Sequence, residues 1–155
     1  MKLSLDFNAA QTTKAKLLSV IDAAGANTSI SLNTAQTWPS ADLVSVIQAA
    51  GAKKFSVSLN GAQLTPAILN PSISAAGTNT SIAINTTQAY VAANGVGFIQ
   101  TAGSKNLNLE FNGAQTTKVM LQSVIGAAGA NTSVSLNTAQ TWPTSDLVNI
   151  VQLAG

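Results

Sequence analysis

The 155-residue chain contains no cysteine, no histidine and no arginine. Without cysteine it forms no disulfide and has no thiolate nucleophile, and without histidine it lacks the commonest general base. Neither residue is available for the usual zinc sites, and the acidic residues are too dispersed along the sequence for a calcium loop. Glycine-rich phosphate-binding motifs are also absent. We therefore expect no enzymatic activity, no metal and no cofactor.

Charged residues make up only 8% of the chain, against about a quarter in an average globular domain. The net charge of +2 includes seven scattered lysines, of which only Lys53 and Lys54 are adjacent, whereas nucleic-acid-binding faces cluster their basic residues. No apolar run approaches the length of about 18 residues typical of a transmembrane helix. Met1 and Lys2 lead directly into a strand pattern rather than a signal peptide. We expect a soluble protein with no nucleic-acid or membrane partner; its location, including a secreted or effector-like one, stays open.

One short unit recurs six times from end to end. Its marker is an asparagine that ends an alternating apolar segment, at intervals of 25, 27, 25, 27 and 25 residues, with a glutamine three residues beyond it. The asparagines are Asn8, Asn33, Asn60, Asn85, Asn112 and Asn137, and the glutamines are Gln11, Gln36, Gln63, Gln88, Gln115 and Gln140. A fixed period of this size is the signature of stacked repeats. We expect one domain, residues 1–155, of six units at about 2–27, 28–53, 54–79, 80–105, 106–131 and 132–155, called units 1 to 6.

Each unit has the pattern of a strand followed by a loop and a helix. Alternating apolar and polar residues at 3–7 predict a half-buried strand, with equivalents at 29–32, 55–59, 81–84, 107–111 and 133–136. Apolar residues between 17 and 24 recur at helical spacing. We expect each of the first five helices to end at a glycine cap, namely Gly25, Gly51, Gly77, Gly103 and Gly129.

Proline and glycine mark where helices begin and where they are weak. Pro39, Pro66 and Pro143 lie at or near expected first turns, where proline is tolerated. Pro71 falls inside the third helix and should shorten or kink it. The fourth helix contains two glycines, at positions 95 and 97, which lower its helical propensity. The centre of the array should therefore be less regular than its ends.

The alternation of strand and helix predicts an α/β solenoid. Each unit feeds a parallel strand in the next through a right-handed crossover, which places the sheet on one face and the helices on the other. A closed β/α barrel is the rival, because eight such units would complete one. Six units, with serine rather than valine or isoleucine on the second strand face, argue against a closed barrel with an apolar interior.

Residues 26–33, with the sequence Ala-Asn-Thr-Ser-Ile-Ser-Leu-Asn, resemble the helix-to-strand junction of ribonuclease-inhibitor-like leucine-rich repeats. Residues 78–82 and 130–134 resemble it too, and similar units occur in bacterial effector proteins with such repeats. The units here are about two residues shorter than is usual in that subclass. The resemblance implies a horseshoe segment with strands on the inner face, helices outside and a partner-binding strand face.

The strand face opposite the helices is the first candidate site. It should carry small polar side chains, with neither the tryptophan, tyrosine nor arginine that anchor most protein interfaces. Asp6 and Glu110 are its only acids, four strands or about 19 Å apart, too far for the carboxylate pair of a glycosidase. The candidate partner-binding residues are Ser4, Asp6, Ser29, Ser31, Ser56, Ser58, Ser81, Asn108, Glu110, Ser133 and Ser135.

The loop rim is the second candidate site. Trp38, Tyr90 and Trp142 occupy matching positions in the even-numbered units, where odd-numbered units have threonine. They are suited either to anchoring a ligand or to packing over the edge of the core, and we favour packing. The asparagine and glutamine columns are interpreted as structural ladders, since neighbouring strands lie about 4.8 Å apart.

Three functional classes are compatible with this pattern. The leading one is a non-enzymatic scaffold that mediates protein–protein interaction. The second is a self-assembling structural or designed array, whose partner is a further copy bound through uncapped ends. The third is an ice- or polysaccharide-binding surface. The third is weakened because Thr28, Thr80 and Thr132 recur only in alternate units.

Overall fold

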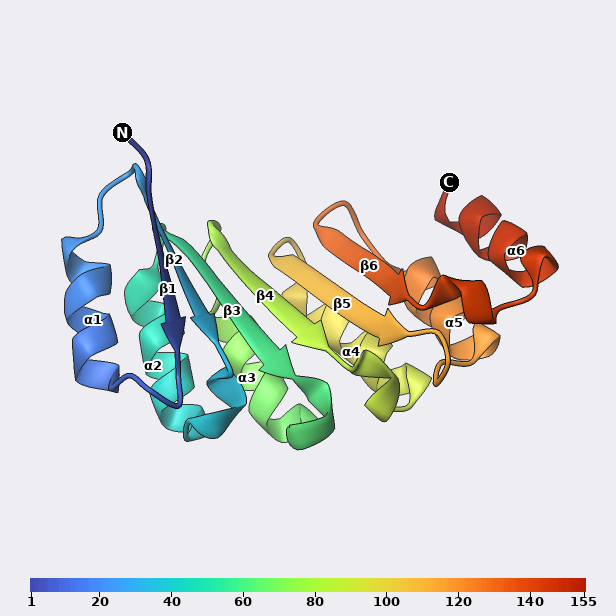
Figure 1. Cartoon of the computed structure of the whole chain (residues 1–155), viewed down its shortest axis with the longest axis horizontal. Helices are drawn as coiled ribbons and strands as arrows, with labels where there is room; N and C mark the ends of the chain where they lie inside the picture. Colours follow the sequence, from blue (N-terminus) through green and yellow to red (C-terminus); the bar gives the residue numbers. More distant parts are fainter.

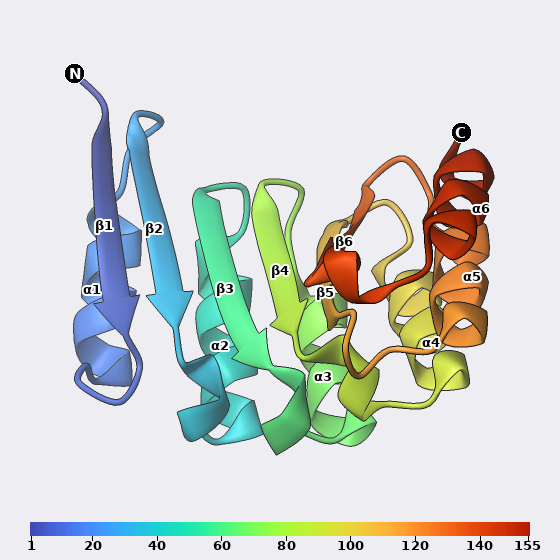
Figure 2. The same ribbon diagram turned by 45° about the vertical axis from the view of Figure 1, so that its right-hand side comes forward.

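The computed structural model describes all 155 residues as one open parallel sheet with six α-helices on one of its faces (Figure 1). The strands are hydrogen-bonded in chain order from β1 to β6, and the two termini lie at opposite ends of the array (Figure 2). The elements are β1 (Leu3–Asn8), α1 (Lys14–Ala23), β2 (Thr28–Asn33), α2 (Ser40–Ala50), β3 (Lys54–Asn60), α3 (Pro66–Ala75), β4 (Thr80–Asn85), α4 (Ala92–Ala102), β5 (Asn106–Asn112), α5 (Lys118–Ala127), β6 (Thr132–Asn137) and α6 (Thr144–Ala154). The predicted α/β solenoid is confirmed, and the sheet is not closed into a barrel.

Short 3₁₀ turns replace part of the loop in four of the units. They are η1 (Ala35–Thr37), η2 (Gly61–Gln63), η3 (Thr87–Ala89) and η4 (Ala139–Thr141). Each follows a strand and contains the repeated glutamine of its unit. None of the six helices has the length and apolar character that crossing a bilayer requires.

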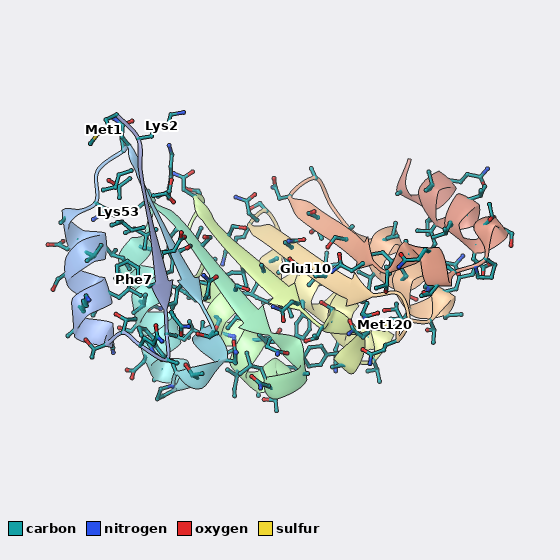
Figure 3. All side chains as sticks on the ribbon, in the orientation of Figure 1. Met1, Lys2, Phe7, Lys53, Glu110 and Met120 are labelled. Carbon is teal, nitrogen blue, oxygen red and sulfur yellow. The ribbon has the colours of Figure 1, made fainter.

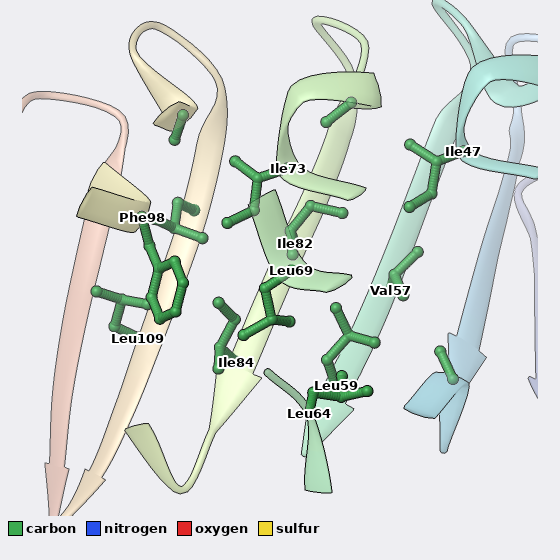
Figure 4. Packing of buried hydrophobic residues seen from close by; sticks show 14 of the residues in the cluster. Ile47, Val57, Leu59, Leu64, Leu69, Ile73, Ile82, Ile84, Phe98 and Leu109 are labelled. Atoms are coloured by element: carbon green, nitrogen blue, oxygen red, sulfur yellow. The ribbon is translucent and has the colours of Figure 1, made fainter. Parts of the chain in front are cut away.

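The hydrophobic core lies between the sheet and the helices and runs the length of the array. Alternate strand residues such as Ile82 and Ile84 in β4 point toward helix residues such as Leu69 and Ile73 in α3 (Figure 4). All four are essentially inaccessible to solvent. Full burial of one such side chain stabilises a fold by about 1.5 to 3 kcal/mol, so the alternation that predicted strands also fixes which strand face meets the helices.

The strand register contains a stagger that the repeat pattern did not predict. Between β1 and β2, Asn8 lies opposite Asn33, as equivalent residues should. Between β2 and β3, however, Leu32 lies opposite Val57, although its sequence equivalent is Leu59. The same shift occurs between β4 and β5, where Ile84 lies opposite Leu109. The sheet is therefore built from in-register pairs of strands that are offset by two residues from one pair to the next.

Two of the glycine caps are confirmed and three are wrong. Gly51 and Gly103 end α2 and α4 with φ of +53° and +57°, the left-handed region that favours glycine. The odd-numbered helices end instead at alanines in an extended conformation, Ala24, Ala76 and Ala128. The following glycines, Gly25, Gly77 and Gly129, do not adopt a positive φ.

A lysine from the next unit caps α1 and α3 in place of glycine. The Lys53 ammonium donates to the carbonyl oxygens of Ile21 and Asp22 at the end of α1, the latter at 2.7 Å. Lys105 donates in the same way to the carbonyls of Ile73 and Ser74 at the end of α3. A cation at a helix C-terminus satisfies unpaired carbonyls and complements the helix dipole. These contacts tie unit 1 to unit 2 and unit 3 to unit 4.

Pro71 does not shorten the third helix. The ten residues of α3 match the ten of α1 and of α5. Leu69 and Ile73, on either side of Pro71, are both buried against the sheet, and Pro71 itself is exposed. Burial of the flanking side chains therefore outweighs the backbone hydrogen bond that proline cannot donate.

The glycines of α4 do not shorten it either, since its eleven residues match those of α2 and α6. Gly95 is buried, and a Cβ added there would lie 2.9 Å from Cγ2 of Val124. Glycine at this position therefore lets α4 approach α5 closely, which offsets its low helical propensity.

Gly77 provides a test of how closely the units stack. A Cβ at this position would overlap the backbone carbonyl of Gly51 in the preceding unit, whereas Gly129, its equivalent in unit 5, has open space around it. We expect Gly77→Ala to lower the free energy of unfolding by about 1 to 3 kcal/mol, as overpacking does. The matched Gly129→Ala should be neutral or should stabilise by less than about 1 kcal/mol, because alanine restricts the unfolded chain. Urea denaturation measures both; equal losses would contradict the close approach.

Candidate functional site

The face of the sheet opposite the helices is uncovered and lined by small polar side chains (Figure 3). Its residues alternate along each strand with those that enter the core, which is why the sequence identified them. The exposed members are Ser4, Asp6, Ser29, Ser56 and Ser133, and the half-buried ones are Ser31, Ser58, Ser81, Asn108, Glu110 and Ser135. Ala83 completes the face in β4, and Lys54 lies exposed at the start of β3. The surface is thus smooth and hydroxyl-rich, with two carboxylates.

Each carboxylate on this face is held by a neighbouring side chain. The Ser31 hydroxyl in β2 donates to the Asp6 carboxylate in β1. The Asn108 amide donates to Glu110, two residues further along β5, at 3.2 Å. The two acids are kept apart by the stagger as well as by three intervening strands. Opposite residues lead from Asp6 across the sheet to Asn106, four residues short of Glu110, so their separation exceeds the roughly 19 Å expected from strand spacing alone.

A polar hollow of 190 Å³ lies beside Glu110 where β4 and β5 end. Its lining comes almost wholly from amide and hydroxyl side chains, including Asn85, Gln88 and Asn112. The Oδ1 atoms of Asn85 and Asn108 are buried without a hydrogen-bond partner. Buried acceptors of this kind cost free energy unless a donor reaches them. The Asn85 amide lines the hollow beside the Glu110 carboxylate, so the hollow presents acceptor groups to an incoming donor. Sequence reasoning missed it because it depends on the register of β4 against β5.

The three rim aromatics each reach back to the preceding unit. The indole nitrogens of Trp38 and Trp142 donate to the carbonyls of Ala9 and Gly113 at 2.8 and 2.7 Å. The Tyr90 hydroxyl donates to the carbonyl of Leu64 at 2.7 Å. All three side chains are half-buried and pack against the core. Their polar atoms are thus already engaged within the fold.

Tyr90 has a further contact inside the array. Its ring meets Phe98 edge to face, with centroids 5.1 Å apart. Desolvation by burial raises the pKa of Tyr90 to about 12. Ionisation would also remove the proton that the hydroxyl donates to Leu64. Tyr90 therefore stays neutral at physiological pH and has no acid–base role there.

The asparagines of the column lie opposite one another in pairs, namely Asn8 with Asn33, Asn60 with Asn85 and Asn112 with Asn137. Asn8, Asn60 and Asn112 each accept the backbone N–H two residues further on, at 2.9 to 3.0 Å, in a local turn. They also accept a threonine hydroxyl from the next unit; the three threonines are Thr34, Thr86 and Thr138. The column is interrupted between these pairs because of the two-residue stagger. The stagger moves the asparagines of units 3 and 5 past those of units 2 and 4.

These three threonines link successive units through their hydroxyl groups. Sequence reasoning did not identify them. Their φ angles are 53° or 54°, a left-handed conformation that β-branched residues rarely adopt. The hydroxyl bond to asparagine accompanies this strained turn in every even-numbered unit. The available signal was a threonine directly after the repeated asparagine of the even-numbered units, where the odd-numbered units have alanine or glycine.

The glutamines of alternate units also form bonds between neighbouring units. Gln36 Oε1 accepts the backbone N–H of Asn60 at 3.3 Å, and Gln88 Oε1 accepts that of Asn112 at 3.0 Å. In addition, the Gln88 amide donates to Gln115 at 3.2 Å. Each such bond joins an even-numbered unit to the odd-numbered unit that follows. The glutamines of units 2 and 4 thus bridge the junctions between units at which the strand register shifts.

The charged groups of the strand face are few and separated. No group of three or more acidic side chains lies close enough to hold a metal ion. Among the strand-face serines, Ser31 donates to a carboxylate, that of Asp6. What the face offers a partner is hydrogen bonding, two separated negative charges and the positive charge of Lys54 at the start of β3.

Comparison with solved structures supports the architecture. A leucine-rich repeat-containing protein from Legionella pneumophila, LegL7, superposes with a TM-score of 0.76 at 16% sequence identity, over 99% of this chain and 53% of that one. The chain thus spans about half the length of that protein. A putative deoxyribose-phosphate aldolase from Coccidioides immitis matches with a TM-score of only 0.45 at 9% identity, over 98% of this chain and 66% of that one. No protein-family model matches the sequence, and no curated protein sequence shows detectable similarity. The chain has a leucine-rich-repeat-like fold.

Proposed function

We propose that the chain is a non-enzymatic scaffold that binds a protein through its strand face. The observation that carries this proposal is the sheet surface, six strands wide and covered by no element of the chain (Figure 1). Five strand spacings of about 4.8 Å give it a width of roughly 24 Å. Small side chains leave the backbone close to the surface, so a partner segment can approach closely along the array.

The chemistry of the face indicates the partner it suits. Because the face has no aromatic or arginine side chain, the anchors typical of interfaces must come from the partner. Asp6 and Glu110 are negative, and the unpartnered oxygens of Asn85 and Asn108 lie near Glu110. A lysine or arginine side chain supplies both the positive charge and the donors that this region lacks. We therefore propose a partner with basic residues spaced to reach Asp6 and Glu110.

The rim aromatics have a structural role in this proposal. Trp38, Tyr90 and Trp142 use their donors to bind the preceding loop, so they staple successive units together instead of anchoring a ligand. The repeats themselves are proposed to belong with the ribonuclease-inhibitor-like subclass. A helix of ten or eleven residues on the outer side of each unit supports this assignment.

An ice- or polysaccharide-binding surface is not favoured. Such a surface needs threonines in a flat, exposed array. Thr80 is fully buried, and Thr28 and Thr132 are half-buried at the starts of β2 and β6. The recurring threonines therefore face the core side of the sheet, where no large ligand can reach them.

Paired serine-to-arginine variants test the strand face. Ser31→Arg and Ser58→Arg place a bulky cation on it, while Ser19→Arg and Ser123→Arg place the same side chain on exposed positions of α1 and α5. We expect the strand-face variants to weaken binding to captured proteins at least tenfold, a loss of about 1.4 kcal/mol, and the helix variants to bind like the parent. Quantitative affinity capture from cell extract followed by mass spectrometry measures this. Equal capture by all four variants would exclude the strand face.

A further inference from the structure

Glu110 differs from the other acidic residues of the chain, because it is half-buried and has no cation beside it. Asp42 and Asp146, also half-buried, each form an ion pair with a lysine, at 2.8 and 2.7 Å. Asp6 and Asp22 are exposed, so water solvates their charge. A carboxylate that is partly withdrawn from water is stabilised by a cation or by several donors. Glu110 therefore has an unmet requirement for positive charge.

The contacts of Glu110 leave one of its oxygens free. The Asn108 amide donates to Oε1 at 3.2 Å, and no group of the chain donates to Oε2. Lys54, the lysine of the strand face, is the first residue of β3, whereas Glu110 lies near the end of β5. Because the strands are parallel, the two charges lie toward opposite edges of the sheet. The cation that Glu110 lacks must therefore come from another molecule.

The strand register places two further polar side chains beside Glu110. Ser135 lies directly opposite it on β6. On the other side Ile84 is paired with Leu109, so the next residue of β4, Asn85, lies beside Glu110. Neighbouring strands are about 4.8 Å apart. Asn85 and Glu110 both line the hollow of 190 Å³, so an amide and a carboxylate on adjacent strands face one opening.

The other amides of this hollow are already engaged in the fold. Gln88 accepts the backbone N–H of Asn112 at 3.0 Å and donates to Gln115 at 3.2 Å. The side-chain oxygen of Asn112 accepts a backbone N–H and the hydroxyl of Thr138. The Asn85 amide makes no hydrogen bond within the chain, and its oxygen is unpartnered. On β4 and β5, the polar groups left for a ligand are thus this amide and the neighbouring carboxylate.

The same junction between units 2 and 3 does not carry these groups. Unit 3 has Ser56 and Ser58 where unit 5 has Asn108 and Glu110. The residue of unit 2 that corresponds to Asn85 is Asn33, which is exposed. The charged hollow is therefore a departure from the repeat and not a consequence of it.

We propose that the hollow beside Glu110 binds the guanidinium group of an arginine side chain. This inference rests on the proposed strand-face function, since the protein partner presents the arginine, and it specifies arginine rather than lysine at this position. A guanidinium is planar and has five N–H donors, of which two bind a carboxylate side by side. The remaining donors point sideways and reach the amide oxygen of Asn85 on the adjacent strand. A lysine ammonium is a compact, strongly hydrated charge, which suits two acceptors on separate strands less well.

Titration with single amino-acid derivatives tests the choice of arginine. The probes are N-acetyl-arginine-amide and N-acetyl-lysine-amide, which carry one charge each, and the readout is the nuclear magnetic resonance spectrum of the ¹⁵N-labelled chain. We expect the arginine derivative to cause saturable shift changes at Asn85, Asn108 and Glu110. The lysine derivative should bind about fivefold or more weakly.

Three variants test the position of the site. Glu110→Gln removes the charge with little change of shape, and Asn85→Ala removes an amide that makes no bond in the fold. We expect each to weaken binding of the arginine derivative, by about tenfold or more for Glu110→Gln. The control Asp6→Asn removes the other acid of the same face and should bind like the parent. A melting temperature equal to the parent's shows that each variant is folded.

Three results would overturn the inference. They are the absence of saturable shifts with the arginine derivative, equal binding of the two derivatives, and a loss in Asp6→Asn as large as that in Glu110→Gln. Failure of the strand-face proposal would look different, because the titration needs no protein partner. Saturable arginine binding together with protein capture that Ser31→Arg and Ser58→Arg leave unchanged would support the guanidinium site and contradict the protein partner.

Discussion

Replacing Ile47 by alanine is expected to lower the free energy of unfolding by about 2 to 5 kcal/mol, the range for deleting a fully buried aliphatic side chain. Ile47 lies in α2 with no exposed surface. Its cover comes from unit 3, because Val151, the same position in the unit that has no successor, is mostly exposed. Most of the expected loss therefore arises from contacts between units rather than within one unit.

The matched variant Val151→Ala isolates that contribution. It removes an aliphatic side chain from an equivalent helix position, but from one that solvent already reaches. We expect a loss of less than about 1 kcal/mol, as for other surface positions. Both values come from urea denaturation. Similar losses for the two variants would mean that successive units contribute little to each other's stability.

The sequence was sufficient to predict the architecture because two independent signals agreed in every unit. The alternation in residues 3–7 and its equivalents gave strands, and the helical spacing that followed each gave the helices. Parallel pairing in chain order then follows from strand–helix alternation. Those predicted strands and the open solenoid are confirmed within one or two residues at each boundary.

What the sequence did not predict depends on contacts between units. The alternating intervals of 25 and 27 residues were visible, but a constant offset of 25 between bonded strands appears only in the register. The caps of α1 and α3 were misassigned to Gly25 and Gly77 because the lysines that cap them lie about 30 residues further on. The effect of Pro71 on the length of α3 was overestimated, because burial of the neighbouring side chains outweighs local helix propensity.

In the candidate site too, the residues could be predicted from the sequence but their contacts could not. The composition of the strand face follows from alternation alone, so its residues could be named from the sequence. The bonds of Asp6 to Ser31 and of Glu110 to Asn108 could not. The hollow beside Glu110 needs the positions of β4, β5 and β6 together, and no single-unit pattern encodes those.

An isolated unit is expected to be unfolded. Unit 3, residues 54–79, contains β3, η2 and α3. Its ten-residue helix is shorter than the about 12 to 15 residues at which isolated helices become even marginally stable. Its strand would have no hydrogen-bonding partner, because β3 pairs only with β2 and β4. The side chains of Leu59, Leu64 and Leu69, all buried in the whole chain, would lose much of their cover.

Far-ultraviolet circular dichroism of a peptide spanning residues 54–79, measured beside the whole chain, tests the shared core most directly. If the units are stable only through their neighbours, the peptide gives the spectrum of an unordered chain and shows no cooperative thermal transition, while the whole chain gives a mixed α/β spectrum and melts cooperatively. A peptide with the helix and strand content of unit 3 and a cooperative melt of its own would contradict the stacked architecture as the source of stability.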